Sequence, residues 1–559
     1  MRRSRFGLPE RDALHAIRLR WQRTVVLAGL TGIVTGLGVA LFDWMTADVL
    51  LAGVHRWPQW AQALAPAAGL LAAALLLRFA ARGASPSTSD EYIRNFHERG
   101  ARLSLGPVAG RMLASVATLG TGGAMGFEGP SIYLGSAVGS FFQRTFSRHF
   151  SREDAKVLLV SGAAAGVSAI FKTPATGALF ALEVPFTQDL AARAALPAVV
   201  ASAASYLTFV AFQGTAPLLA VRGHPGFDLT DLAGAALIGL LCGAGARGFV
   251  WLIRRSKDLQ RMLPPWSAWL IGGAALAGIG ALGFAAFDEP LALGPGYRAV
   301  TWLTDPSRDL GLIALLLVAR ALATAFTVAG GGAGGLFVPL VVEGAILGRL
   351  IAGVLKLTRT TLFPLVGAAA FLGAGYRTPI ASVMFVAEST GRPGFVVPAL
   401  IATVVAQLVM GRSSISPYQQ QMRGGHVEQR FRMPVTTVLV RDPYTVAPTA
   451  TVEDLIHRHF IQARSRAIPV VEVNRYLGMV RLEDVDGVPR EERAATTVAE
   501  VMRTDVDAAS SGWTLRQAVA AMETADVDQI AVVDAGVFVG VVTMDDILSL
   551  EEILDATSD

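Results

Sequence analysis

One acidic residue stands in a stretch of sequence that is otherwise small and apolar. Residues 123–135 read GAMGFEGPSIYLG, and Glu128 is the single charge among them. A lone carboxylate at membrane depth costs on the order of 3 kcal/mol on insertion scales, so such residues are functional by default. At the start of a helix, a carboxylate can take the place of a free anion on the exposed N–H groups. We predict that Glu128 is a gate and a candidate proton carrier; the alternative is a structural N-cap carboxylate.

A second motif indicates where the partner of this gate lies. GLFVP, which ends at Pro339, has the same small and apolar character as GFEGP. Proline suits the first turn of a helix, where its missing N–H costs nothing, and glycine lets the backbone bend and approach an ion closely. Both motifs therefore predict helix starts within the membrane, and two facing starts would form an anion site without Lys or Arg. The residues that flank the gate are Gly126, Phe127, Gly129 and Pro130.

The membrane region contains an internal repeat. Gly162–Glu183 reads GAAAGVSAIFKTPATGALFALE, and Gly367–Glu388 reads GAAAFLGAGYRTPIASVMFVAE. Interrupted helices at corresponding positions of two halves are typical of transporters, whose sites lie near the bilayer midplane. Generic glycine packing between helices is the alternative, but it does not explain the shared order. Upstream, one constant offset relates Gly126, Pro130, Gly135 and Gly139 to Gly335, Pro339, Gly344 and Gly348.

Composition predicts a membrane protein. The 559 residues are 52% hydrophobic and only 16% charged, with a mean hydropathy of +0.48, whereas soluble proteins carry about 25% charged residues. Arginines ahead of the first apolar run predict a cytoplasmic N-terminus, and this position explains the basic segment without nucleic-acid binding. Five runs without charge are long enough to cross a hydrocarbon core as helices: Thr24–Phe42, Trp57–Leu77, Ala194–Val221, Met262–Phe287 and Pro393–Gly411.

Composition changes near Arg423, after which charged residues and short β-like runs follow. The predicted fold is an all-α membrane domain with an inverted repeat and broken helices, followed by a soluble α/β domain. We expect a multi-pass protein of the cell membrane with both termini cytoplasmic. The predicted parts are a basic segment (1–23), the transmembrane domain (24–425) and two soluble modules (430–495 and 496–559).

The motifs of the membrane region resemble the CLC chloride channel and transporter family. The resemblance rests on GFEGP, on GGLFVP, and on a tyrosine in SSISPYQQQ. It implies that Glu128 is the gating glutamate and that the Tyr418 hydroxyl donates to a central chloride. It also implies a homodimer with one pore per subunit, embedded in lipid, that carries chloride and in some members protons. The chloride would meet the backbone N–H groups of the turn formed by Gly335, Leu336 and Phe337.

A serine usually completes the inner end of this site in the family. Ser87 stands at that position in ASPSTSDEYI, although the glycines and proline of the family motif are missing. Ser85 or Ser89 could substitute for Ser87 by a small shift. Hydroxyl and backbone N–H donors suit chloride, while nitrate and fluoride remain alternative substrates.

Two departures from the family pattern bear on the transport mode. Phe127 replaces the Lys or Arg that usually precedes the gating glutamate, which lowers the positive field at the outer mouth. Val184 replaces the glutamate that accepts protons from the inside in many proton-coupled members. We therefore favour a passive or weakly coupled, voltage- or pH-gated chloride channel, with an H+/Cl− antiporter as the alternative. Glu183 and Glu388 are expected to make packing and polar contacts within the bundle.

The C-terminal region also repeats. Arg466–Val485 and Asp528–Leu548 each read as a strand, a turn, a second strand and an acidic helix start. This resembles paired CBS modules, which commonly bind adenine nucleotides. The resemblance implies that Thr543 contacts phosphate and Asp546 contacts ribose, whereas the first module has Arg481 at the hydroxyl position. The alternative is a dimerisation module that binds no ligand.

Two other classes of function are weighed against anion transport. A CBS-regulated transporter of divalent metal ions would need clustered Asp or Glu, and the membrane region contains isolated glutamates instead. An intramembrane enzyme would need a paired nucleophile and base or an HExxH motif, and the eight histidines form no such motif. We predict no enzyme activity, no required cofactor and no metal site.

Overall fold

The computed structural model describes residues 11–98, 103–146, 154–219, 227–357, 361–420, 431–460, 466–547 and 549–550. The start of the basic N-terminal segment lies outside these ranges. The chain divides into two compact units, Met1–Gln421 and Met422–Asp559, which are described separately below.

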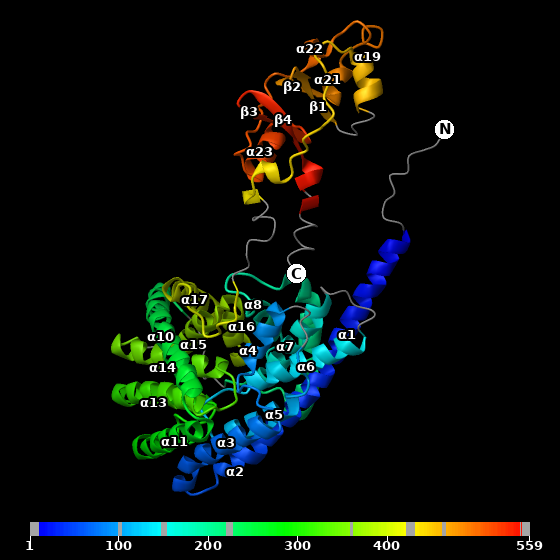
Figure 1. Ribbon diagram of the computed structural model, residues 1–559. Coiled ribbons are helices and arrows are strands. Elements are labelled where there is room, and N and C mark those ends of the chain that lie inside the picture. The colour runs from blue at the N-terminus through cyan, green and yellow to red at the C-terminus, as the bar shows by residue number, and fades with distance from the viewer. Residues whose placement is uncertain are drawn as a thin grey trace. The chain divides into compact units, whose positions relative to one another are not determined.

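The first unit is a bundle of helices (Figure 1). Among the described residues, eight helices are long and apolar enough to cross a membrane. This confirms the predicted fold class of an all-α multi-span membrane domain. Its main helices are α1 (Arg11–Asp43), α3 (Gln59–Phe79), α4 (Ser89–His97), α5 (Val108–Gly120), α6 (Glu128–Thr145), α7 (Asp154–Phe171), α8 (Pro174–Glu183), α9 (Ala195–Gln213), α10 (Leu229–Met262), α11 (Pro265–Phe287), α13 (Leu310–Ala329), α14 (Phe337–Val354), α15 (Leu362–Tyr376), α16 (Pro379–Thr390) and α17 (Val396–Met410). Shorter helical segments are Trp44–Leu51, α2 (Ala52–Val54) and α12 (Tyr297–Trp302).

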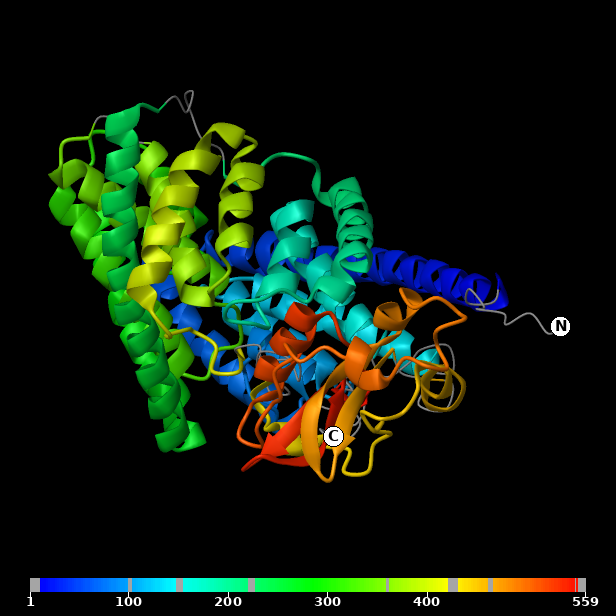
Figure 2. The same ribbon diagram turned by 90° about the horizontal axis from the view of Figure 1, so that it is seen from above.

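The sequence repeat is a structural repeat. In both views the first half, coloured blue to cyan, and the second half, coloured green to yellow, occupy neighbouring parts of the unit (Figures 1 and 2). Helix α6 packs on α7 through Gly135 and Gly162, and a Cβ on either residue would overlap the carbonyl oxygen of the other. Gly344 of α14 and Gly367 of α15 repeat this contact. The glycines are therefore required by a backbone-to-backbone approach, and they occupy equivalent places in both halves.

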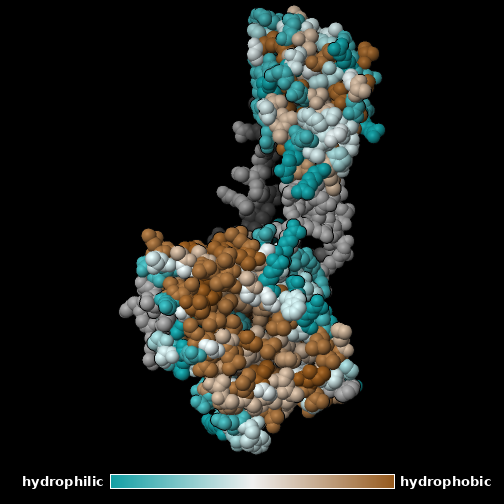
Figure 3. Space-filling model, turned by 90° about the vertical axis from the view of Figure 1, so that its left-hand side faces the viewer, coloured by the Kyte–Doolittle hydropathy of each residue, from teal (hydrophilic) through white to brown (hydrophobic). Residues whose placement is uncertain are grey.

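The surface of this unit matches a lipid-facing bundle. Hydrophobic residues gather over one broad face of the helical unit (Figure 3). Large apolar side chains are exposed on several helices, among them Leu207 and Phe212 on α9 and Leu408 on α17. Monomeric soluble proteins rarely expose so large an apolar patch to water.

The second unit contains two small modules of the same plan. Strands β1 (Ala467–Glu472) and β2 (Arg475–Arg481) form one antiparallel hairpin, and β3 (Gln529–Asp534) and β4 (Val537–Thr543) form the other. Both hairpins have a register shift at the same place, which supports an internal duplication. The helices of this unit are α19 (Val452–Asp454), the π-helical turn Leu455–Phe460, α21 (Leu482–Asp486), α22 (Val498–Val501) and α23 (Leu515–Ala525).

Candidate functional site

The two predicted helix starts face each other. Helix α6 begins at Glu128 and α14 begins at Phe337. Just before them, Gly126 and Gly335 exchange two backbone hydrogen bonds of 2.9 and 2.8 Å. Because this bridge joins the two turns, the free N–H groups of both helices are directed at one small region between them.

Glu128 occupies this region. Its side chain is fully buried, and its Oε1 accepts a 2.7 Å hydrogen bond from the backbone N–H of Phe337. Its Oε2 has no hydrogen-bond partner among the described residues. The carboxylate therefore does not cap its own helix but lies at the N-terminus of the opposite one. A free anion would seek the same N–H group, so the two compete for one place.

Glycine backbone surrounds the carboxylate on both sides. A Cβ added at Gly126 would overlap Glu128 Oε2, and one added at Gly335 would overlap Oε1. A Cβ at Gly129 would meet the Thr88 hydroxyl and the Gly335 backbone. The Glu128 carboxylate therefore fits only because these three positions lack side chains. This explains why the flanking residues of GFEGP and GGLFVP are glycines.

An aromatic cluster encloses the start of α14. The Phe337 ring packs against Phe171 at 4.7 Å, Phe385 at 4.9 Å and Phe180 at 5.2 Å between ring centroids. Phe171 ends α7, Phe180 lies in α8 and Phe385 lies in α16, so both repeats contribute. The cluster keeps the amide groups at this helix start away from lipid and water, which strengthens their attraction for an anion.

The tyrosine that the structure brings to this cluster is Tyr376. Its side chain is 1% exposed, its ring packs on Phe180 at 5.4 Å, and its hydroxyl lies 3.5 Å from the Ser89 hydroxyl. Tyr418 is 37% exposed, and the structure does not bring it into this group. The motif comparison missed Tyr376 because it stands in the repeat unit, in the position that Phe171 holds in the first half. The alignment of Phe171 with Tyr376 between the two repeat units was the sequence signal that could have identified Tyr376.

The serine segment lines a small cavity of about 30 Å³ beside the helix starts. Ser87 and Ser89 both lie in its wall, together with Leu336. Thr88 donates from its hydroxyl to the Gly334 carbonyl at 3.3 Å, which fixes the segment against the turn of α14. The chloride-binding role of Ser87 stays a prediction, and Ser89 is the serine whose hydroxyl lies 3.5 Å from that of Tyr376. A cavity of this volume has room for one small occupant.

A larger cavity of about 350 Å³ borders the start of α6. Phe127, Lys172 and Tyr297 contribute to its wall. Phe127 of the large cavity directly precedes Glu128, and Leu336 of the small cavity directly precedes Phe337. Each helix start is therefore bordered by a cavity.

The glutamates that close the repeat units cap each other's helices. Glu183 accepts hydrogen bonds from the N–H groups of Ile380 (3.1 Å) and Ala381 (2.7 Å) at the start of α16. Glu388 accepts from the N–H groups of Ala175 (2.9 Å) and Thr176 (2.7 Å), and from the Thr176 hydroxyl (2.6 Å), at the start of α8. The expectation of polar contacts within the bundle is confirmed.

Val184 directly follows one of these caps. Its side chain is 1% exposed, and its carbonyl accepts from the Gln419 amide at 2.8 Å. The position where many proton-coupled relatives carry an acid is therefore apolar and enclosed.

In the second unit, the predicted nucleotide residues bind each other. The Thr543 hydroxyl donates to Asp546 Oδ2 at 2.5 Å and accepts from the Asp546 N–H at 3.1 Å. At the matching place of the first module, Arg481 pairs with Asp484 at 2.9 Å. Both modules thus hold their strand-to-helix turn with a side-chain contact between the same two positions.

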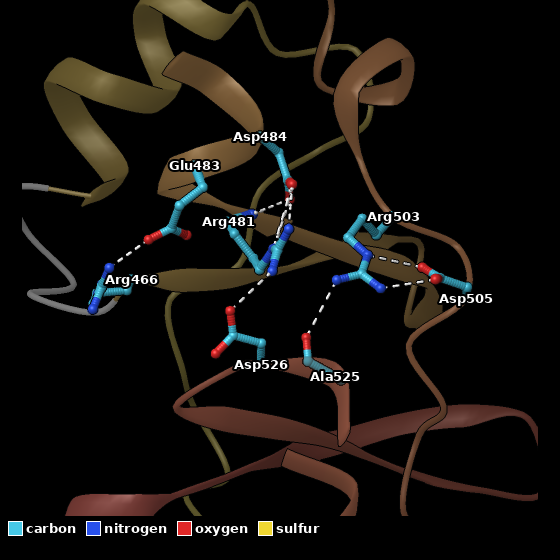
Figure 4. A network of polar contacts seen from close by, with 8 residues as sticks. All are labelled: Arg466, Arg481, Glu483, Asp484, Arg503, Asp505, Ala525 and Asp526. Carbon is cyan, nitrogen blue, oxygen red and sulfur yellow. Dashed lines mark hydrogen bonds and ion pairs between the residues drawn. The ribbon is translucent and has the colours of Figure 1, made fainter. Parts of the chain in front are cut away.

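Two arginines make contacts at the end of α23 (Figure 4). Arg481 also reaches Asp526 at 3.5 Å, and Arg503 donates to the Ala525 carbonyl at 3.2 Å, both at the end of α23. Arg503 pairs with Asp505 at 2.8 Å, and this hydrogen bonding lowers the pKa of the Asp505 carboxyl. The Arg481 side chain therefore contacts the second module, and Arg503 of the second module exchanges backbone hydrogen bonds of 2.9 and 2.7 Å with Met479 of the first.

The fold and the site together define a membrane anion transporter built on an inverted repeat. A family model described as voltage gated chloride channel matches residues 68–411, and a model of the CBS domain matches residues 435–488 and 498–552. The chain belongs to the voltage gated chloride channel family, usually called CLC, and carries a pair of CBS domains.

Relatives in this family are ion exchangers. The chain is 28% identical over 419 residues to the H(+)/Cl(−) exchange transporter ClcA of Citrobacter koseri, covering 69% of this chain and 86% of the relative. It is also 28% identical over 418 residues to ClcA of Cronobacter sakazakii, covering 69% and 87%.

Solved structures share the fold at low identity. A slow cyanobacterial Cl−/H+ antiporter has a TM-score of 0.62 at 22% identity, covering 69% of this chain and 94% of that one. A CLC-type fluoride/proton antiporter has a TM-score of 0.60 at 21% identity, covering 72% and 98%. A eukaryotic CLC transporter has a TM-score of 0.60 at 17% identity, covering 94% and 98%.

Proposed function

We propose that this protein exchanges chloride for protons across a membrane. The observation that carries the proposal is the carboxylate of Glu128 on the Phe337 N–H group, at the start of a helix where an anion would bind. Chloride and the ionised carboxylate repel each other and cannot share this place. When chloride takes the N–H group, the carboxylate must leave, and a proton then neutralises it. One group that competes with the anion and carries the proton couples the two fluxes.

The exchange mode replaces the channel that the sequence favoured. That preference depended on Val184, yet the relatives with 28% identity are named as exchangers of protons and chloride. Val184 then predicts that protons reach Glu128 without a carboxylate at position 184. Chloride is the proposed substrate because these relatives are named for it, and because residues with hydroxyl side chains, Ser87, Thr88 and Ser89, line the small cavity.

Flux measurements on purified protein in liposomes test this function. A chloride gradient should drive proton movement in the opposite direction in the native protein. Glu128→Gln keeps the side-chain size but cannot exchange protons, so proton flux should fall to background while chloride flux continues without pH dependence. Native protein that carries chloride without moving protons would favour the channel, and unchanged coupling in Glu128→Gln would remove Glu128 from the mechanism.

Assembly, orientation and regulation are further parts of the proposal. We expect a homodimer with one pore per subunit and with both termini in the cytoplasm. An adenine nucleotide would bind at Thr543 and Asp546, whose mutual hydrogen bonds would open to accept it. Titration of the full-length protein with ATP tests this point, with Thr543→Val as the variant expected to lose binding. No heat or fluorescence change at millimolar ATP would favour a purely structural pair of modules.

A further inference from the structure

A buried ion pair lies beside the small cavity. Lys257 Nζ contacts Asp90 Oδ2 at 2.7 Å, and the two side chains are only 16% and 11% exposed. Asp90 stands in the first turn of α4 and Lys257 near the end of α10, so the pair connects two separate helices. Removing two charges from water costs several kcal/mol per ion unless their geometry compensates. Charged residues in membrane domains commonly pair with one another, and they mark ion pathways.

The position of this pair gives it access to the anion site. Asp90 and Lys257 are the charged members among the described residues that line the cavity of about 30 Å³, and Ser89 and Leu336 line the same cavity. Leu336 directly precedes Phe337, whose N–H group holds Glu128. An ion in this cavity therefore lies next to both the Asp90–Lys257 pair and the residue that precedes the start of α14.

Neighbouring charges are engaged elsewhere. Glu91 pairs with Arg111 at 3.1 Å and with Arg94. On α10, Arg261 pairs with Asp258 at 3.4 Å, with both side chains more than half exposed. Lys257 is thus the cation that an anion in the cavity would meet, and Asp90 is the group that already neutralises it.

We propose that Asp90 and Lys257 form a latch that closes this mouth of the anion pathway. An arriving anion takes the place of the Asp90 carboxylate on Lys257, and the displaced carboxylate opens the cavity. Glu128 is proposed to act in the same way, because its carboxylate occupies the position of the transported anion. Glu128 binds a backbone N–H group, whereas Asp90 binds the ammonium group of Lys257. The inference rests on the proposed function only in that anions cross this site. It does not require that protons are coupled.

Two single substitutions should have opposite effects. Asp90→Asn frees the charge of Lys257, so chloride flux at low chloride should rise and the chloride KM should fall by about tenfold, the lower end of electrostatic focusing at a charged mouth. Lys257→Gln leaves an unpaired carboxylate at the mouth, so flux at low chloride should fall by a similar factor. Saturating rates should change less than KM in both variants. A pair that only stabilises the fold would make both variants fail in the same direction.

Further variants separate the latch from folding defects. The exchanged pair Asp90→Lys with Lys257→Asp should restore flux toward the native value. Asp258→Asn on the same helix, which alters the exposed pair, is the matched control and should change nothing. Cysteines at 90 and 257, joined by a short bifunctional thiol reagent, should stop flux until a reductant is added; the native Cys242 is buried and does not interfere.

The test of the latch can fail independently of the test of proton exchange. Chloride and proton fluxes are recorded together in the same vesicles. Opposite changes in chloride flux without any proton movement would reject exchange and retain the latch. Changes in the same direction for Asp90→Asn and Lys257→Gln, flux that the thiol reagent does not stop, or absence of chloride flux in every protein would overturn the latch.

Discussion

The two halves of the membrane region have the same backbone plan but carry different chemistry at equivalent positions. The first repeat begins its broken helix with Glu128, and the second begins its own with Phe337. At the next break the first repeat has Phe171 and Lys172, and the second has Tyr376 and Arg377. Lys172 and Arg377 both adopt left-handed backbone angles, with φ of 56° and 57°. The shared plan of the two halves builds two facing helix starts, and the differing side chains place a carboxylate of the first half on a backbone N–H group of the second.

The basic residues of the two breaks serve different ends of the bundle. Lys172 donates to the Gln213 carbonyl at 3.0 Å and lines the large cavity. Arg377 donates from Nε to the Thr187 carbonyl at 3.1 Å and also contacts the Gly411 carbonyl. Phe127 stands where the family usually has a cation. Lys172 lines the same cavity as Phe127 and brings a cation to it from a different helix break. A repeat that is inverted in the membrane places equivalent residues toward opposite sides.

The largest expected effect tests the shared backbone plan itself. Gly135→Ala and Gly344→Ala each place a Cβ against a facing carbonyl oxygen, and such overpacking costs about 3 kcal/mol or more where backbone cannot move. Both should sharply reduce the yield of monodisperse protein after detergent extraction. Gly248→Ala, whose Cβ would meet nothing within 4 Å, is the control and should leave the yield unchanged. Normal yield for only one of the two variants would show that the halves are not equivalent.

The reciprocal caps offer a finer comparison. Glu183→Gln and Glu388→Gln each replace a charged acceptor at a helix start by a neutral one, at a cost of roughly 1–3 kcal/mol. Glu388 accepts from three donors and Glu183 from two, so Glu388→Gln should lower the unfolding temperature more. Thermal unfolding in detergent measures this order. The control is Glu289→Gln, whose exposed pair with Arg298 contributes little. The reverse order would contradict the cap assignment.

The smallest expected effect shows whether Tyr376 or Tyr418 binds chloride. Tyr376→Phe removes the hydroxyl that lies beside Ser89, and it should weaken chloride binding by about 1 kcal/mol, or about fivefold, the scale of one hydrogen bond. Tyr418→Phe should leave binding unchanged because this side chain is partly exposed. Calorimetric titration with chloride measures both. Loss of binding in Tyr418→Phe alone would restore the tyrosine that the motif comparison chose.

Local features of the sequence were sufficient for a large part of this picture. The helix starts at GFEGP and GLFVP, the duplicated GAAA segments and the paired hairpins of the second unit all follow from residues close together in the chain. Glycine and proline restrict or free the backbone at their own positions, so their pattern predicts where helices begin. The low charge content likewise predicted a membrane domain without any knowledge of packing.

Contacts between distant residues were decided only by the tertiary structure. Glu128 could have capped its own helix, yet it accepts from Phe337, 209 positions away. The sequence likewise did not show that Tyr376 lies beside Ser89, that the caps Glu183 and Glu388 are exchanged between repeats, or that Asp90 pairs with Lys257. The physical reason is that a side chain's partner depends on which helices pack together. That packing arises from the whole bundle, whereas helix starts arise from a few adjacent residues.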